Sequence, residues 1–145
     1  MKKIAISACL LGRACRYDGR ENRDDVLLET LEEAELIPFC PEDFCYGTPR
    51  PTMDLVETAQ GIRALSNFTG ADLSAPIIAY AQTFFDTHPD IDLLIGKDRS
   101  PSCGVRSARL YDRQKHLLSE EATGLMVAVA KEKGISCCDA ERLIR

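Results

Sequence analysis

Short apolar runs alternate along the chain with stretches that have helical periodicity. Three runs have the length and content of buried strands, namely Ile4–Ala8, Leu36–Phe39 and Ile91–Ile95. The clearest helix begins after Asp72 or Ser74, because apolar residues recur there at positions i, i+1, i+4, i+7 and i+8. These residues are Ile77, Ile78, Ala81, Phe84 and Phe85. Strands and helices therefore alternate, which is typical of an α/β fold.

The remaining elements have weaker signals. A helix is expected from Asn22 or Asp24 to about Ala34, and a hairpin is expected around Gln60-Gly61. The hairpin strands are Asp54–Val56 and Ile62–Leu65, and the later elements are a strand Ala108–Tyr111, a helix Glu120–Lys133 ended by Gly134, and a strand Ile135–Cys137. The order predicts a single domain over residues 1–145, in three layers, with a mainly parallel sheet covered by helices on both faces.

A cysteine follows each of the three predicted buried strands. Cys9 comes directly after the first strand, Cys40 after the second, and Cys103 a few residues after the third, in the run Lys97–Gly104. Because the carboxyl ends of parallel strands converge on one crevice in an open α/β sheet, we expect these thiols to line a common site.

Composition narrows the kind of protein. The 145 residues are 45% hydrophobic, enough for one continuous core, and no apolar stretch approaches the roughly 20 residues that span a bilayer. The start Met1–Ile4 leads into a short strand and not into a signal peptide, so we expect a cytoplasmic protein without a membrane partner. Seven cysteines, an odd number, favour metal or redox chemistry over disulfides. The formal net charge of −5 argues against a large nucleic-acid partner.

Four motifs together resemble a known bacterial family. They are Ser7–Gly12 (SACLLG), Cys15–Gly19 (CRYDG), Cys40-Pro41-Glu42 with Pro49-Arg50-Pro51, and Ser100–Gly104 (SPSCG). In this order they resemble the thiouracil desulfidases, a family once known only as a domain of unknown function. The resemblance implies a Rossmann-like domain that holds a [4Fe-4S] cluster on three cysteines and removes sulfur from thiolated uracil without net redox change.

The chemistry of such a cluster is consistent with three protein ligands. Thiolates hold iron–sulfur clusters, and three of them leave one iron open, as catalytic zinc sites keep one position open. A soft open iron suits the sulfur of a thiocarbonyl. Cys9 and Cys103 are the expected ligands from the family motifs. The third ligand is Cys45, Cys40 or Cys15; we favour Cys45, which is expected in a flexible loop, over Cys40, which ends an apolar strand.

Proton transfer also needs a residue near the cluster. Glu42 is the candidate because it lies three residues before Cys45 in the Cys-Pro-Glu motif. Ser100 and Ser102 are expected to bind the pyrimidine edge or the attacking water, although this segment is also a competent tight turn. Lys97 is expected to stabilise developing negative charge.

Two other functions use the same cysteines. A structural zinc module would normally show closely spaced Cys-x-x-Cys pairs, and an electron-transfer protein would normally show four cysteines in tighter spacing. This chain has neither pattern, which argues against both functions. The adjacent Cys137 and Cys138 are assigned to structure.

The expected partner is a small thiolated pyrimidine, either a free base or a nucleoside. Basic side chains around the mouth of the site are expected to accept any phosphate, namely Arg16, Arg50, Lys97 and Arg99.

Overall fold

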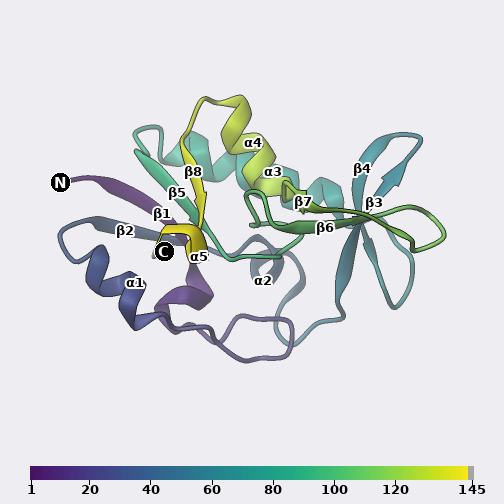
Figure 1. Ribbon diagram of the computed structural model, residues 1–145, viewed down its shortest axis with the longest axis horizontal. Coiled ribbons are helices and arrows are strands. Elements are labelled where there is room, and N and C mark those ends of the chain that lie inside the picture. Colours follow the sequence, from purple (N-terminus) through teal and green to yellow (C-terminus); the bar gives the residue numbers. More distant parts are fainter. Residues whose placement is uncertain (144–145) are drawn as a thin grey trace.

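Two four-stranded sheets lie side by side in the computed structural model, which describes residues 1–143 (Figure 1). The first sheet has the order β2-β1-β5-β8 and all its pairs are parallel. Its strands are β1 (Lys3–Ser7), β2 (Glu35–Phe39), β5 (Leu93–Gly96) and β8 (Cys137–Asp139). The second sheet has the order β4-β3-β6-β7 and is mixed. Its strands are β3 (Met53–Thr58), β4 (Gly61–Ser66), β6 (Ala108–Tyr111) and β7 (Leu117–Ala122).

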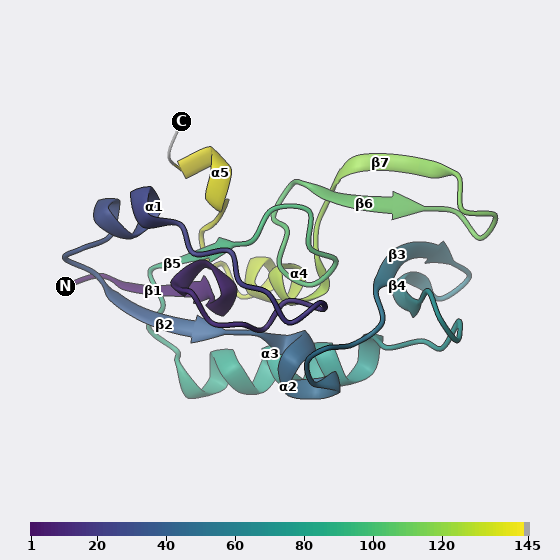
Figure 2. The ribbon, with the colours of Figure 1, turned by 90° about the horizontal axis from the view of Figure 1, so that it is seen from below.

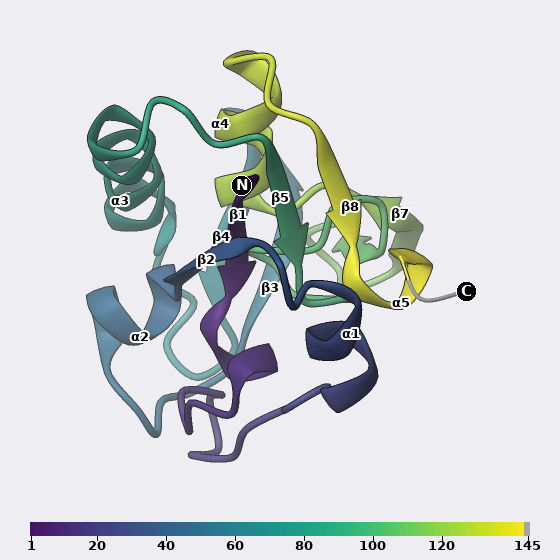
Figure 3. The ribbon, with the colours of Figure 1, turned by 90° about the vertical axis from the view of Figure 1, so that its left-hand side faces the viewer.

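Helices cover both faces of the parallel sheet, with α3 (Ser74–Thr87) and α4 (Leu125–Glu132) on one side and α1 (Asp25–Thr30) and α5 (Ala140–Leu143) on the other (Figure 3). The two-residue period of the strands decides which side chain meets which layer. Ala5 and Leu94 pack in the cluster that includes α3 and α4, whereas Ile4, Ile6 and Ile95 pack in the opposite cluster. The short helices η1 (Ala8–Leu11) and α2 (Pro41–Tyr46) follow β1 and β2.

Helix α3 packs against both sheets (Figure 2). Its predicted apolar face is confirmed, since Ile77, Ala81, Phe84 and Phe85 are buried. The two phenylalanines pack in the core of the parallel sheet, while Ile77 packs against the second sheet. Burial of each such side chain contributes about 1.5–3 kcal/mol, so α3 holds the sheets in a fixed relation.

The prediction of one mainly parallel sheet was correct only for half of the strands. The expected hairpin forms, but it starts a separate mixed sheet that β6 and β7 complete. The predicted helix Glu120–Lys133 was wrong at its start, because residues up to Ala122 pair with β6 and the helix begins only at Leu125. Strand pairing outweighs the helical propensity of the two glutamates there.

Smaller differences concern element ends. Helix α1 starts where expected, with the Asp24 carboxylate accepting a hydrogen bond from the Leu27 amide at 3.0 Å, but it ends at Thr30 instead of Ala34. The last strand runs two residues later than predicted. Among residues 1–143, no helix is both long and apolar enough to cross a membrane.

Candidate functional site

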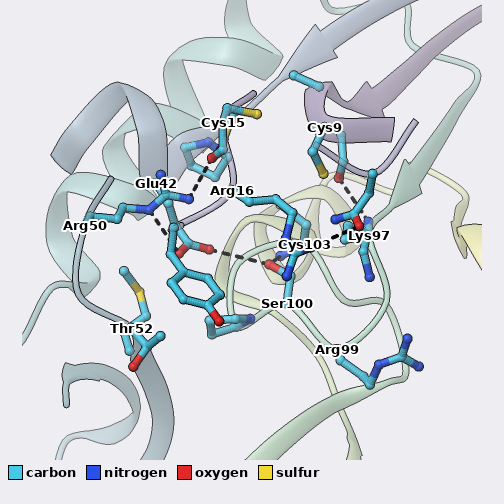
Figure 4. A pocket seen from close by; sticks show the side chains of 18 of the residues that line it. Cys9, Cys15, Arg16, Glu42, Arg50, Thr52, Lys97, Arg99, Ser100 and Cys103 are labelled. Atoms are coloured by element: carbon cyan, nitrogen blue, oxygen red, sulfur yellow. Dashed lines mark hydrogen bonds and ion pairs between the residues drawn. The ribbon is translucent and has the colours of Figure 1, made fainter. Parts of the chain in front are cut away.

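A cavity of about 470 Å³ opens at the carboxyl ends of β1, β2 and β5 (Figure 4). The residues that follow these three strands all line it, among them Cys9, Cys40 and Lys97. Cys103 lines it as well, although it lies seven residues beyond the end of β5. The expected convergence of the three strand ends is therefore confirmed. A volume of this size is in the usual range for small-molecule sites.

The loop that carries Cys103 (residues 97–104) packs closely against two glycines from different elements. A Cβ atom on Gly96, at the end of β5, would lie 1.8 Å from the Cys103 carbonyl oxygen. A Cβ on Gly124, just before α4, would lie 2.5 Å from the carbonyl carbon of Ser102. The first amides of α4 then donate to the loop, since the amides of Leu125 and Met126 bond the carbonyls of Pro101 and Ser102 at 3.0 and 2.9 Å. Only glycine permits this close approach of three backbones.

We therefore expect Gly96→Ala to destabilise the protein by about 3 kcal/mol or more, the upper end of the cost of overpacking a core. The added methyl group has only backbone atoms to displace. Urea unfolding of the cluster-free protein measures the change. Gly70→Ala is the control, because a Cβ there meets nothing within 4 Å and only the positive φ costs about 1–2 kcal/mol. Equal losses in the two variants would show that the close approach is not important.

Glu42, in the cavity wall, lies against both predicted serines, which stand 58 and 60 positions later in the sequence. The Ser102 hydroxyl donates to Glu42 Oε2 at 2.8 Å, and the Ser100 hydroxyl lies 3.5 Å from the same oxygen. Ser100 also shapes the turn, since its oxygen accepts from the amides of Ser102 and Cys103 at 3.2 and 3.1 Å. Ser102 is fully buried and does not line the cavity, whereas Ser100 does.

Arg50 lines the cavity as one of the predicted basic residues, but it lies in the cavity wall. Its side chain is only 6% exposed, so it does not sit at the mouth as an exposed cation. The guanidinium donates to the carbonyls of Gly47 and Cys15, each at 2.9 Å, and its Nε lies 3.7 Å from Glu42 Oε1. Arg50 therefore ties the Cys15 loop to the loop after α2 and places a positive charge beside Glu42. The Thr-Pro-Arg-Pro context was the available sequence signal.

The other three basic candidates bind different partners. Lys97 lines the cavity, with its amide bonded to the Ser7 hydroxyl at 3.0 Å and its Nζ donating to the Asp98 carbonyl at 3.2 Å. Arg99 forms a two-point ion pair with Glu141, at 2.7 and 3.2 Å. Arg16 lines the cavity and bonds Asn22.

The cysteines differ in their relation to the cavity. Cys9, Cys15, Cys40 and Cys103 line it, and burial raises the pKa of each thiol, that of Cys15 to about 12. Cys45 does not line it and lies in helix α2, so the expected flexible loop around it was wrong. Cys45 stands three residues after Glu42 and therefore on nearly the same side of the helix.

Within residues 1–143, the thiols are not arranged as a site for a single metal ion. No group of three or more His, Cys, Asp and Glu side chains in this part of the chain is arranged to hold a metal ion. A single zinc ion needs its thiolates around one point about 2.3 Å away, whereas the thiols here are distributed around a cavity.

Comparison with known proteins decides the family. The profile of the 2-thiouracil desulfurase family matches residues 4–142, nearly the whole chain. The chain belongs to the 2-thiouracil desulfurase family. This desulfurase fold is also similar to a solved structure of the [4Fe-4S]-dependent thiouracil desulfidase TudS, with a TM-score of 0.75 and 28% identity over 99% of this chain and 93% of that one. The uncharacterized protein YbbK of Bacillus subtilis (strain 168) is 25% identical over 144 residues, covering 90% of this chain and 91% of YbbK.

Proposed function

We propose that this chain removes sulfur from a small thiolated uracil with a [4Fe-4S] cluster held by three cysteines. The observation that carries the proposal is Glu42, bonded to Ser102 and beside Arg50, on the wall of a cavity that also carries Cys9 and Cys103. An acid–base group next to soft sulfur ligands is the combination that hydrolysis of a C–S bond requires.

The residues present are consistent with such a cluster. Several thiols from separate strand ends surround one cavity, and thiolates are the ligands of iron–sulfur clusters. Two buried donors of the cavity wall, Asn22 Nδ2 and Arg50 Nε, have no hydrogen-bond partner within the described chain. Arg50 Nε still faces Glu42 Oε1 in an ion pair at 3.7 Å, so Asn22 Nδ2 is the donor that supports a bound group, because buried donors without partners are rare. When bound, the cluster supplies an iron without a protein ligand, a soft acceptor for the thiocarbonyl sulfur.

Cys9 and Cys103 are two of the proposed ligands, and we keep Cys45 as the third. Its thiol makes no hydrogen bond to residues 1–143, whereas the Cys40 thiol donates to the Cys15 carbonyl at 3.8 Å. Cys40 is the competing residue because it already lines the cavity with the other two. Cys45 would reach them only by turning from α2 toward the cavity.

Glu42 has the role of proton carrier in this proposal. It takes a proton from the water that attacks the ring carbon, and a proton then passes to the ring nitrogen or the departing sulfur, so the reaction yields uracil and sulfide. Ser102, which is buried against Glu42, positions the carboxylate, and Ser100 faces the substrate side. Lys97 contributes a positive charge to the same cavity, where it stabilises negative charge on the substrate.

The substrate is proposed to be a free base or nucleoside. The cavity volume suits one pyrimidine, and the chain is acidic, with a formal net charge of −5. All seven cysteines are unpaired, which favours the reducing cytoplasm.

The test is anaerobic turnover by the reconstituted protein on 2-thiouracil, 4-thiouracil, their nucleosides and thiolated transfer RNA. We expect sulfide and the oxygenated pyrimidine in equal amounts from at least one of the small substrates, in a protein that contains iron and acid-labile sulfide. A colourless protein with stoichiometric zinc and no turnover would contradict the proposal. Desulfuration of the transfer RNA alone, with salt-sensitive binding, would contradict the proposed substrate size.

A further inference from the structure

Asn22 is attached to the backbone of Cys9. It lies between η1 and α1, where its amide donates to the Cys9 carbonyl at 2.9 Å. Two residues later, the amide of Asp24 donates to the Leu10 carbonyl at 3.1 Å. The two bonds hold the segment that carries Asn22 against η1, and Asn22 lines the cavity together with Cys9.

The orientation of the Asn22 side chain is set by Arg16. Arg16 Nη1 donates to Asn22 Oδ1 at 3.3 Å. A guanidinium has only donors, so it selects the oxygen end of the amide and turns the NH₂ end away from itself. Asn22 Nδ2 is then buried and has no hydrogen-bond partner among residues 1–143.

Asn22 and Cys9 line the same wall of the cavity, since the Asn22 backbone amide is bonded to the Cys9 carbonyl and both residues belong to the lining. A thiol sulfur is a weak acceptor, whereas a thiolate is a much stronger one. A sulfur that ligates a metal is a thiolate, so a cluster-bound Cys9 is an acceptor suited to the unpartnered Asn22 donor.

We propose that Asn22 is a positioning residue for the iron–sulfur cluster, whose Nδ2 donates a hydrogen bond to the Cys9 sulfur when that sulfur is a ligand. The inference rests on the proposed function, because it needs a cluster on Cys9. Hydrogen bonds to ligand sulfurs draw electron density from them and raise the reduction potential of the cluster. Outer partners of this kind also secure the ligand, and their loss typically weakens metal binding about 10- to 100-fold.

Asn22→Asp is the deciding variant, because it keeps the shape of the side chain and replaces the donor with a carboxylate oxygen. We expect it to assemble the cluster, to lose iron to a chelator about 10-fold faster than the unchanged protein, and to have a more negative reduction potential. The terminal iron–sulfur stretch in resonance Raman spectra should shift to higher frequency. Asn22→Ala should change these properties in the same direction to a smaller extent, since it removes the donor without adding charge.

Asn67→Ala is the matched control. Asn67 lines the same cavity, but its Nδ2 already donates to Thr52 Oγ1 at 2.9 Å. Its chelation rate, potential and Raman spectrum should equal those of the unchanged protein. Arg16→Ala, which frees the Asn22 amide to rotate, should produce an intermediate effect.

The outcomes separate this inference from the proposed function. If the wild-type protein takes up no cluster, both the proposed function and the role of Asn22 are contradicted. A fully loaded Asn22→Asp protein with unchanged chelation rate, potential and Raman spectrum would overturn only the role of Asn22. Thermal unfolding of the cluster-free variants identifies any loss of folding, and Asn22→Ala then decides if Asn22→Asp does not fold.

Discussion

Cys103→Ser is expected to remove the cluster and the activity together. Cys103 is one of only three proposed protein ligands, and the hydroxyl of serine is a much poorer ligand for iron than a thiolate. The Cys103 thiol is buried and its backbone is packed between Gly96 and Gly124, so the fold fixes the position of this ligand. Iron and acid-labile sulfide should fall below a tenth of the unchanged protein, and sulfide release should be undetectable. Colorimetric iron analysis and anaerobic turnover measure both.

Three further serine variants complete this experiment. Cys137→Ser is the matched control, because this half-buried thiol donates to the Ile135 carbonyl, lies outside the cavity lining, and should keep full iron content. Cys45→Ser is expected to lose the cluster, and Cys40→Ser to retain it. Loss of iron in Cys40→Ser with retention in Cys45→Ser would move the third ligand to Cys40. Full iron in Cys103→Ser would remove the thiolate site from the proposal altogether.

Glu42→Gln is expected to keep the cluster and to lose about 10²- to 10⁴-fold in turnover, the usual contribution of a positioned acid–base group. Glutamine has nearly the same size, and its oxygen can still accept from the Ser102 hydroxyl, so the cavity wall should stay intact. It cannot take a proton from water. Anaerobic turnover of 2-thiouracil at matched iron content measures the loss.

Asp54→Asn is the control for this variant. Asp54 is a second carboxylate of the same cavity, but it lies on β3 and outside the group formed by Glu42, Ser102 and Arg50. Its turnover should change less than about 10-fold, because it carries no proton in the proposal. If Glu42→Gln turns over normally with a full cluster, proton transfer must be assigned to Ser100 or Lys97 instead.

Local signals in the sequence were enough to find the strands that carry the site. The apolar runs before Cys9 and Cys40 are β1 and β2, and the turn chemistry of Ser100–Gly104 marked a loop beyond the end of a strand. Helix α3 was also predictable, because four of its five periodic apolar residues are buried. Such signals depend on residues close together in the chain, and burial of an apolar face or satisfaction of a turn needs little further information.

Contacts between residues far apart in the sequence determined the arrangement of the site and the pairing of the strands. The sequence determined the motif residues, the chemistry of their side chains and the convergence of three strand ends. Only the tertiary structure joined Glu42 to Ser102, 60 positions away, buried Arg50 beside it, and set Cys40 in the cavity wall and Cys45 outside it. It also divided the strands into two sheets, because residues 117–122 pair with β6 in spite of their helical composition. Strand partners, buried charges and the direction of a thiol depend on what packs around them, and a one-dimensional pattern does not contain this information.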